Sequence, residues 1–462
     1  MLAVYWALPS YKAQNIFLLL GSYFFYACWD VRFLALIFAV TGAGYWAASS
    51  IESNFGDAKR RKQVLIAFLV FSLSLLGVFK YFDFFSTSLS DLMRSVGLQA
   101  TPFLLHLVLP AAISFYTFES ISYVVGAYKK ELKSPASFLD FALFIGFFPK
   151  LVAGPIERPN VLIPQIRNKR TIDLSGVTRG VFLILLGLFK KVAIADGLAP
   201  FVSAVFDSPG TRTASEVALG SLAFAFQIYG DFSGYSDIAR GVSMLFGIQL
   251  SLNFNFPYFS RDPSEFWRRW HISLSSWLRD YVYIPLGGNR DGEFHTYKNL
   301  ILTMLVGGLW HGAGWPYIIW GLFHGALLAV HRWLSPLLAP VRGHASGLVR
   351  GLYSVFALGA FFLLTCYGWL LFRASSLQVI SGMTGALLSG QTQLNSLVMP
   401  PLSALLGVPV LLLYDHLGHR AGVQFFHERW PAALRGALYA TLMVLILAGA
   451  SNARSAFIYF QF

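Results

Sequence analysis

Apolar runs long enough to cross a membrane recur along the whole chain. A spanning helix needs about 20 mostly apolar residues. Weaker apolar stretches lie at 217–230, 238–249 and 299–309. The stronger stretches are 14–29, 33–49, 64–82, 107–126, 137–153, 180–206, 316–334, 352–372, 400–414 and 434–450. This pattern predicts an all-α polytopic membrane protein with about ten to thirteen segments, some of them broken by Gly and Pro.

The charge content excludes several other classes of protein. Of the 462 residues, 12% are charged and 56% are apolar, whereas a soluble domain carries about 25% charged residues. A soluble enzyme, a disordered chain and a coiled coil are therefore excluded. The net charge of +13 fits basic loops on the cytoplasmic side of a membrane, so nucleic-acid binding is not expected.

The basic loops also predict the topology of the first half. Residues 58–62 and 129–133 are rich in Lys and Arg, which places both loops on the cytoplasmic side. Two predicted spans separate them, so the loop at 83–101 should lie outside.

No linker or internal repeat divides the sequence, so we expect one membrane-embedded domain over 1–462, with its chemistry at about 225–332. Cys28 and Cys366 lie far apart in apolar runs, which predicts neither a disulfide framework nor a Cys-based metal site. The first ten residues lack a basic segment and a small-residue cleavage site, so no cleavable signal peptide is expected.

Residues 251–298 differ from the rest of the chain, because they hold no full span but many Trp, Arg, Asp and His residues. Asp262, Pro263 and Glu265 form a strong helix start. Apolar and aromatic residues then recur at helical spacing up to Tyr281, which predicts one amphipathic helix over 262–281.

Trp270 and His271 fall on the aromatic face of this predicted helix, and Arg268 and Arg269 lie off it. An interfacial helix with its arginines at lipid headgroups explains the arginines. It explains poorly why the imidazole of His271 sits among aromatic rings, so structural and functional roles both stay open for His271.

The run Gly307–Trp315 places Trp310 and His311 among four glycines, at the end of an apolar stretch. Glycines let a backbone approach a ligand closely, and a neutral imidazole can act as a base near pH 7. The alternative is a hydrogen-bonded core histidine.

A third polar run contains Asp231, Ser233 and Asp237. Its two carboxylates are six residues apart and do not share a helix face. The run is interpreted as a polar helix break in which Asp237 caps the next helix, with paired carboxylates for acid–base work as the alternative. His324 and His331 suggest packing or a lined cavity, and no histidine spacing predicts a metal site.

Together, the runs Asp231–Asp237, Phe266–Asn289 and Gly308–Trp315 resemble the membrane-bound O-acyltransferase family, in particular its bacterial branch that acetylates exopolysaccharides such as alginate and cellulose. The resemblance extends from about residue 11 to the end. Family members usually open with a full apolar helix, and here ten residues precede Tyr11. The resemblance implies a ring of spanning and re-entrant helices around a central tunnel.

The resemblance also implies roles for single residues. His311 corresponds to the catalytic base and His271 to the second histidine of the family. The donor would be a cytoplasmic acetyl thioester, acetyl-CoA or an acetylated carrier, with no bound cofactor. The acetyl group would reach a polysaccharide outside a bacterial inner membrane, directly or through a periplasmic relay protein.

Other groups complete the predicted site. His271, the indole N–H of Trp310 or glycine amides could stabilise the oxyanion, and Trp270, Asp231, Ser233 and Asp237 could line the site. Arg268, Arg269 and Lys298 could contact donor phosphates, and lipid headgroups are the alternative. Rival functions are acyl transfer to teichoic acid, lipid or protein, and transport, although transporters usually show repeats.

Overall fold

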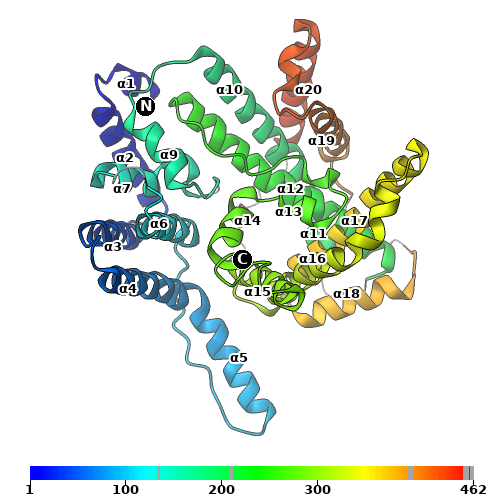
Figure 1. The fold of residues 1–462 in the computed structure, drawn as a ribbon. Helices are drawn as coiled ribbons and strands as arrows, with labels where there is room; N and C mark the ends of the chain where they lie inside the picture. The colour runs from blue at the N-terminus through cyan, green and yellow to red at the C-terminus, as the bar shows by residue number, and fades with distance from the viewer. Residues whose placement is uncertain (133–135, 153, 208–211, 394–398, 451–456, 458–462) are drawn as a thin grey trace. The chain divides into compact units, whose positions relative to one another are not determined.

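The computed structural model describes residues 1–132, 136–152, 154–207, 212–393, 399–450 and 457. Lys133 of the second basic loop lies outside this part of the chain. The described residues form helices of α, π and 3-10 type and contain no strand (Figure 1). This confirms the predicted all-α class.

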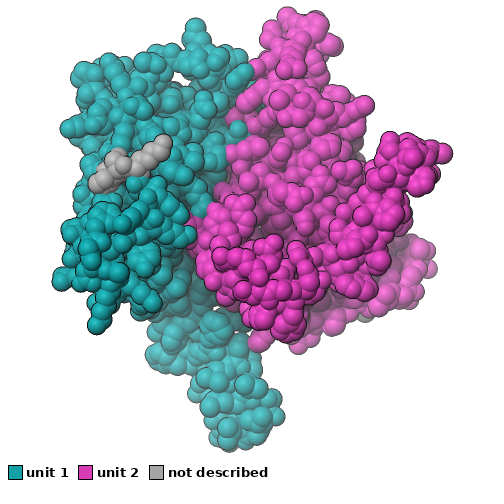
Figure 2. All heavy atoms as spheres, viewed as in Figure 1, with its two compact units in different colours: residues 1–182, 239–251 teal, residues 183–238, 252–462 magenta. Residues whose placement is uncertain are grey.

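The chain divides into two compact units, which Figure 2 colours separately. Unit 1 comprises residues 1–182 and 239–251, and unit 2 comprises 183–238 and 252–462. Two of the three unit boundaries fall inside α10 (Leu174–Leu188) and α12 (Ala214–Leu245), and the third, at 251/252, lies outside any helix.

Unit 1 holds the N-terminal helices. They are α1 (Leu2–Ala7), α2 (Tyr11–Ala27), α3 (Phe33–Ser53), α4 (Ala58–Leu76), η1 (Gly77–Tyr81), α5 (Phe82–Ser95), α6 (Ile113–Tyr128), α7 (Phe138–Gly146), α8 (Phe148–Leu151) and α9 (Pro159–Arg167). One buried ionic group of this unit is matched, as a charge in apolar surroundings requires. Glu119 pairs with Lys150 and accepts a hydrogen bond from the amide of Glu157 at 3.0 Å.

Unit 2 holds the segments that carry the sequence motifs. It includes the last part of α10 and most of α12. Its other helices are η2 (Phe189–Ala195), α11 (Asp196–Phe206), η3 (Pro257–Phe259), α13 (Pro263–Trp267), α14 (Ile272–Leu278), η4 (Arg279–Tyr283), α15 (Glu293–His311), α16 (Trp315–Arg342), α17 (Gly347–Arg373), α18 (Leu377–Ser389), α19 (Leu402–Ala421), η5 (Phe426–Arg429) and α20 (Ala432–Gly449). Helices α15 and α16 form a closely packed hairpin, in which Gly308 and Gly321 meet the backbone of the opposite helix.

Several helices are long and apolar enough to cross a membrane unaided. Within the described residues these are Phe33–Ser53, Ala58–Ser95, Gly347–Arg373, Leu402–Ala421 and Ala432–Gly449. Other predicted segments are shorter or interrupted. The stretch 137–153, for example, breaks at Phe147 between α7 and α8. The chain is a multi-pass membrane protein.

Three local expectations are wrong. Residues 82–95 form helix α5, so the predicted loop at 83–101 is mostly helical. The polar run 231–237 lies inside the uninterrupted helix α12, so it is not a helix break and Asp237 caps nothing. Residues 262–281 form α13, α14 and part of η4 instead of one helix, because the chain turns at 268–271.

Candidate active site

His311 is the last residue of α15, and close packing against α16 holds it there. A Cβ atom on Gly308 would lie 2.2 Å from the carbonyl oxygen of Tyr317, and one on Gly312 would lie 2.2 Å from the Tyr317 ring. Only glycine fits at these positions, so the two helices approach closely on either side of His311. Gly308 and Gly312 therefore allow the close packing that positions His311.

His271 lies in the turn between α13 and α14, with a backbone φ of +43°. A non-glycine residue in this left-handed region is uncommon and costs of order 1–3 kcal/mol. The predicted helix start is nevertheless correct, since the Asp262 side chain accepts a hydrogen bond from the amide of Glu265 at 2.8 Å. The helix that begins there ends after little more than one turn, so His271 lies in the turn instead of on a helix face.

Asn253 holds this turn in place, and sequence reasoning missed it. Its backbone carbonyl accepts from the amide of Ile272 at 2.9 Å. Its side-chain oxygen accepts from the amide of Ser273 at 3.3 Å and from the Ser273 hydroxyl at 2.9 Å. The same oxygen lies 3.2 Å from Nδ1 of His271. In the sequence, the only signal for Asn253 was a polar residue in the short stretch ahead of the segment 262–281.

These contacts determine the tautomer of His271. The amide N–H of Ser273 can only donate, so the Asn253 atom that it contacts is the oxygen, which can only accept. Nδ1 of His271 must therefore carry the proton. His271 is fully buried and lies outside the spanning helices, and its burial lowers the pKa to about 3. The ring is neutral, so its Nε2 atom presents a lone pair.

The fold brings the two predicted histidines together. Their ring centroids are 6.4 Å apart, although 40 positions separate them in the sequence. Trp310 contacts both rings, at 5.5 Å from His271 and 4.9 Å from His311. Both histidines are buried, His271 at 0% and His311 at 5% exposure.

Aromatic rings enclose this pair. Trp320 and Phe372 lie 5.0 and 5.2 Å from His311, and Phe232 lies 4.6 Å from His271. Such surroundings exclude water and strengthen hydrogen bonds. Trp270 lies next to this enclosure, where it packs against Phe254 and Trp369.

The predicted residues of α12 have other partners. Asp231 and Asp237 form ion pairs with Lys191 and Lys190, each at 2.7 Å. Ser233 is buried on the same helix. Only Phe232 of this run contacts His271 through its ring. The carboxylates therefore belong to a buried ionic network.

Sequence reasoning also missed the two lysines of this network. Lys190 and Lys191 are consecutive in the π-helical segment η2. Lys191 contacts Asp196 at 2.9 Å as well as Asp231. Adjacent lysines inside the apolar stretch 180–206 were the signal, because charge at such a position is costly without a partner.

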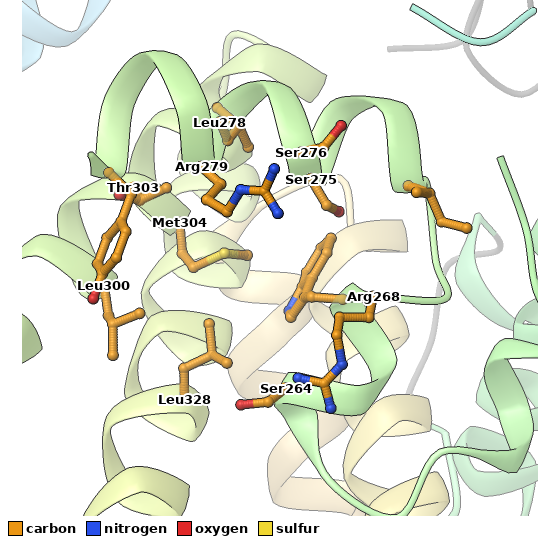
Figure 3. A pocket seen from close by; sticks show the side chains of 13 residues that line it. Ser264, Arg268, Ser275, Ser276, Leu278, Arg279, Leu300, Thr303, Met304 and Leu328 are labelled. Atoms are coloured by element: carbon orange, nitrogen blue, oxygen red, sulfur yellow. The ribbon is translucent and has the colours of Figure 1, made fainter. Parts of the chain in front are cut away.

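A cavity of about 620 Å³ lies in unit 2 and is lined by residues of α13, α14, η4, α15 and α16 (Figure 3). Its walls include Trp267 of α13, Ile272, which directly follows His271, and Met304 of α15. Trp267 lies 5.7 Å from Trp320, whose ring in turn contacts His311. By this route two indole rings, those of Trp267 and Trp320, lie between the cavity and His311.

The predicted donor-binding residues lie in different places. Arg268 lines the cavity together with Arg279, and Figure 3 shows Arg268 beside Ser264. Arg269 instead donates to Glu265 at 2.9 Å and to the carbonyl of Asn255 at 3.2 Å. Lys298 is exposed on α15 and does not line the cavity.

One prediction follows from the turn at His271. Asn253→Ala removes the acceptor for Ser273 and His271, so it should destabilise the protein by about 1–3 kcal/mol and lower activity. Asn253→Asp keeps an acceptor oxygen and should lose less of both. Thermal unfolding and activity of the purified variants provide the measurement. Equal losses in both variants would contradict a role for the accepting oxygen.

Comparisons with known proteins identify the family of the chain. The model of the membrane-bound O-acyltransferase family matches residues 16–372. The chain is 44% identical over 415 residues to the probable alginate O-acetylase of Azotobacter vinelandii, covering 89% of this chain and 80% of that protein. It is 40% identical over 478 residues to the probable alginate O-acetylase of Pseudomonas putida, covering 98% and 96%.

A relative named for a different acceptor is also similar. The peptidoglycan O-acetyltransferase of Helicobacter pylori is 39% identical over 415 residues, covering 82% of this chain and 76% of that protein. The family match spans most of the chain, including the three motif regions. The chain is a membrane O-acyltransferase and belongs to the membrane-bound O-acyltransferase family.

Proposed function

We propose that the chain transfers an acetyl group from a cytoplasmic thioester, acetyl-CoA or an acetylated carrier, to a polysaccharide hydroxyl on the other side of a bacterial inner membrane. The observation that carries this proposal is the buried pair of His271 and His311, together with a 620 Å³ cavity bordered by Ile272, which follows His271. Relatives named for alginate and peptidoglycan acetylation support a sugar hydroxyl as the acceptor. Transfer proceeds directly or through a periplasmic relay protein.

In this proposal His311 is the general base. Its ring takes the proton from the acceptor hydroxyl as the oxygen attacks the thioester carbonyl carbon. The resulting tetrahedral intermediate collapses, the carbon–sulfur bond breaks, and the proton passes from His311 to the leaving thiolate. Base catalysis of this kind contributes about 10²–10⁴-fold.

His271 has a different role in this proposal. A neutral ring with its proton on Nδ1 offers a lone pair at Nε2, so it cannot donate to an oxyanion. It can accept a hydrogen bond from the acceptor hydroxyl or from a neighbouring donor and so orient the reacting groups. His271→Gln is the informative variant, since glutamine restores an acceptor in a similar volume.

Trp310 supplies the proposed oxyanion donor, because its ring contacts both histidines. Trp310→Phe keeps an aromatic ring and removes the N–H. We expect kcat to fall by about 10²–10³-fold with little change in KM, as for the loss of one oxyanion donor. Steady-state kinetics with the purified protein tests this. A kcat within twofold of the wild type would exclude Trp310 as the oxyanion donor and leave the glycine amides as the candidates.

The overall function is tested with purified protein in lipid vesicles and acetyl-CoA labelled in its acetyl group. Label should appear on an alginate oligosaccharide, a peptidoglycan fragment or a co-reconstituted relay protein, and the preferred acceptor identifies the branch. Release of label to water alone, with no label on any of these acceptors, would overturn the sugar-hydroxyl proposal. Teichoic acid and lipid acceptors in the same assay test the alternatives.

A further inference from the structure

A second cavity in unit 2 is rich in arginine. It has a volume of about 430 Å³ and is lined by Arg261, Asp262, Arg342, Arg350, Tyr353 and Ser354. Three of these six residues are guanidinium groups and one is a carboxylate. None of them lines the first cavity. The lining therefore carries excess positive charge.

The partners of two arginines are all neutral groups or backbone. Arg342 donates to the Tyr353 hydroxyl at 3.0 Å and to Nε2 of His331 at 3.0 Å. Arg350 donates to the carbonyls of His344 and Ala345. Within the described residues, no carboxylate lies within 4.0 Å of either guanidinium group.

The single carboxylate of the cavity is already engaged. Asp262 accepts from the amide of Glu265 at 2.8 Å and lies 3.9 Å from Nδ1 of His331. Because Arg342 can only donate to His331, the neutral ring carries its proton on Nδ1, facing Asp262. Arg261 has a loose contact with Glu265 at 3.7 Å, and Glu265 also pairs with Arg269 at 2.9 Å. The acidic groups nearby are thus shared and cannot neutralise all the arginines.

The cavity lies next to the first one along the chain. Arg261 and Asp262 line the second cavity, while Ser264, Trp267 and Arg268 line the first. The segment 261–268, which includes α13, therefore contributes neighbouring residues to both. Arginine around the turn between α16 and α17 also predicts a cytoplasmic position, since basic residues gather on that side.

We propose that this arginine pocket binds a phosphate group from the cytoplasmic side. Guanidinium groups bind phosphate oxygens through paired N–H donors. Two chemical sources carry such a group here: the nucleotide part of a CoA-type donor, or the headgroup of an anionic phospholipid. The donor source rests on the proposed function, and it would place the acyl-bearing arm near the first cavity.

The test compares the double variant Arg342→Gln/Arg350→Gln with Arg332→Gln. Arg332 is a matched control, because it lies on α16 like Arg342 but pairs with Glu293 at 2.8 Å and does not line the pocket. Binding of coenzyme A is measured by calorimetry, and retention of phosphatidylglycerol by native mass spectrometry. The double variant should lose at least tenfold in one of the two, and Arg332→Gln should stay within twofold in both.

The pattern of loss identifies the source. A donor phosphate predicts weaker coenzyme A binding and a higher KM for acetyl-CoA at unchanged kcat, with no change for S-acetylpantetheine, which lacks the nucleotide. A lipid headgroup predicts loss of phosphatidylglycerol alone. Unchanged binding of both ligands overturns the proposal.

Two further variants keep the outcome clear. Arg350→Gln alone removes only contacts to backbone carbonyls, so it serves if the double variant does not fold, with the same two binding measurements at a smaller expected loss. His311→Ala should bind both ligands like the wild type. Binding without transfer in the wild-type protein would overturn the proposed function while leaving the phosphate pocket intact.

Discussion

His311→Ala should leave a folded membrane protein that no longer transfers acetyl groups at a useful rate. The substitution removes the proposed base from a buried position among aromatic rings, where no neighbouring side chain is proposed to replace it. We expect kcat to fall by about 10²–10⁴-fold, the usual contribution of a general base. The measurement is acetyl transfer from labelled acetyl-CoA by protein purified in equal amounts, with thermal unfolding recorded for each sample.

His295→Ala is the matched control for this loss. His295 lies on the same helix, α15, but is exposed and contacts the backbone carbonyl of Asp291 at 2.9 Å. Its replacement should change the rate by less than twofold. A His311→Ala protein that transfers acetyl groups at the wild-type rate would remove His311 from the chemistry, whatever its effect on stability.

The sequence pointed to His271 and His311 as candidate site residues for physical reasons. A histidine among glycines at the end of an apolar run had few roles other than function or a buried hydrogen bond, and a second histidine on an aromatic stripe raised the same question. The structure brings His271 and His311 to 6.4 Å and encloses both in aromatic rings. The helical class was equally predictable, because spanning segments leave a clear apolar signature.

What the sequence could not predict depended on tertiary contacts. The periodicity from Trp267 to Tyr281 favoured one helix, but hydrogen bonds from Asn253 stabilise a left-handed turn at His271 instead. Likewise, Asp231 and Asp237 suggested a helix break, because an unpaired carboxylate in apolar surroundings is costly in free energy. Their partners, Lys191 and Lys190, lie 40 or more positions away, and pairing lets α12 continue.

Lys191→Met should destabilise the protein more than any other single substitution in this ionic network. Lys191 contacts Asp231 at 2.7 Å and Asp196 at 2.9 Å, and all three side chains are largely buried. Methionine fills a similar volume but removes the ammonium group that balances two carboxylates. Breaking a buried pair in this way costs about 3–5 kcal/mol, which should appear as a large fall in unfolding temperature and in yield from membranes.

Compensating substitutions separate charge balance from packing. Lys191→Met/Asp231→Asn removes one positive and one negative charge together, so part of the lost stability should return, because a buried ion pair replaced by neutral groups is often nearly neutral in free energy. Lys191→Arg keeps the charge in a larger group and should be milder than methionine. If the double variant is as unstable as Lys191→Met plus Asp231→Asn measured separately, the two residues are not coupled. The ionic pairs would then not be what allows α12 to run uninterrupted past His271, with Phe232 against its ring.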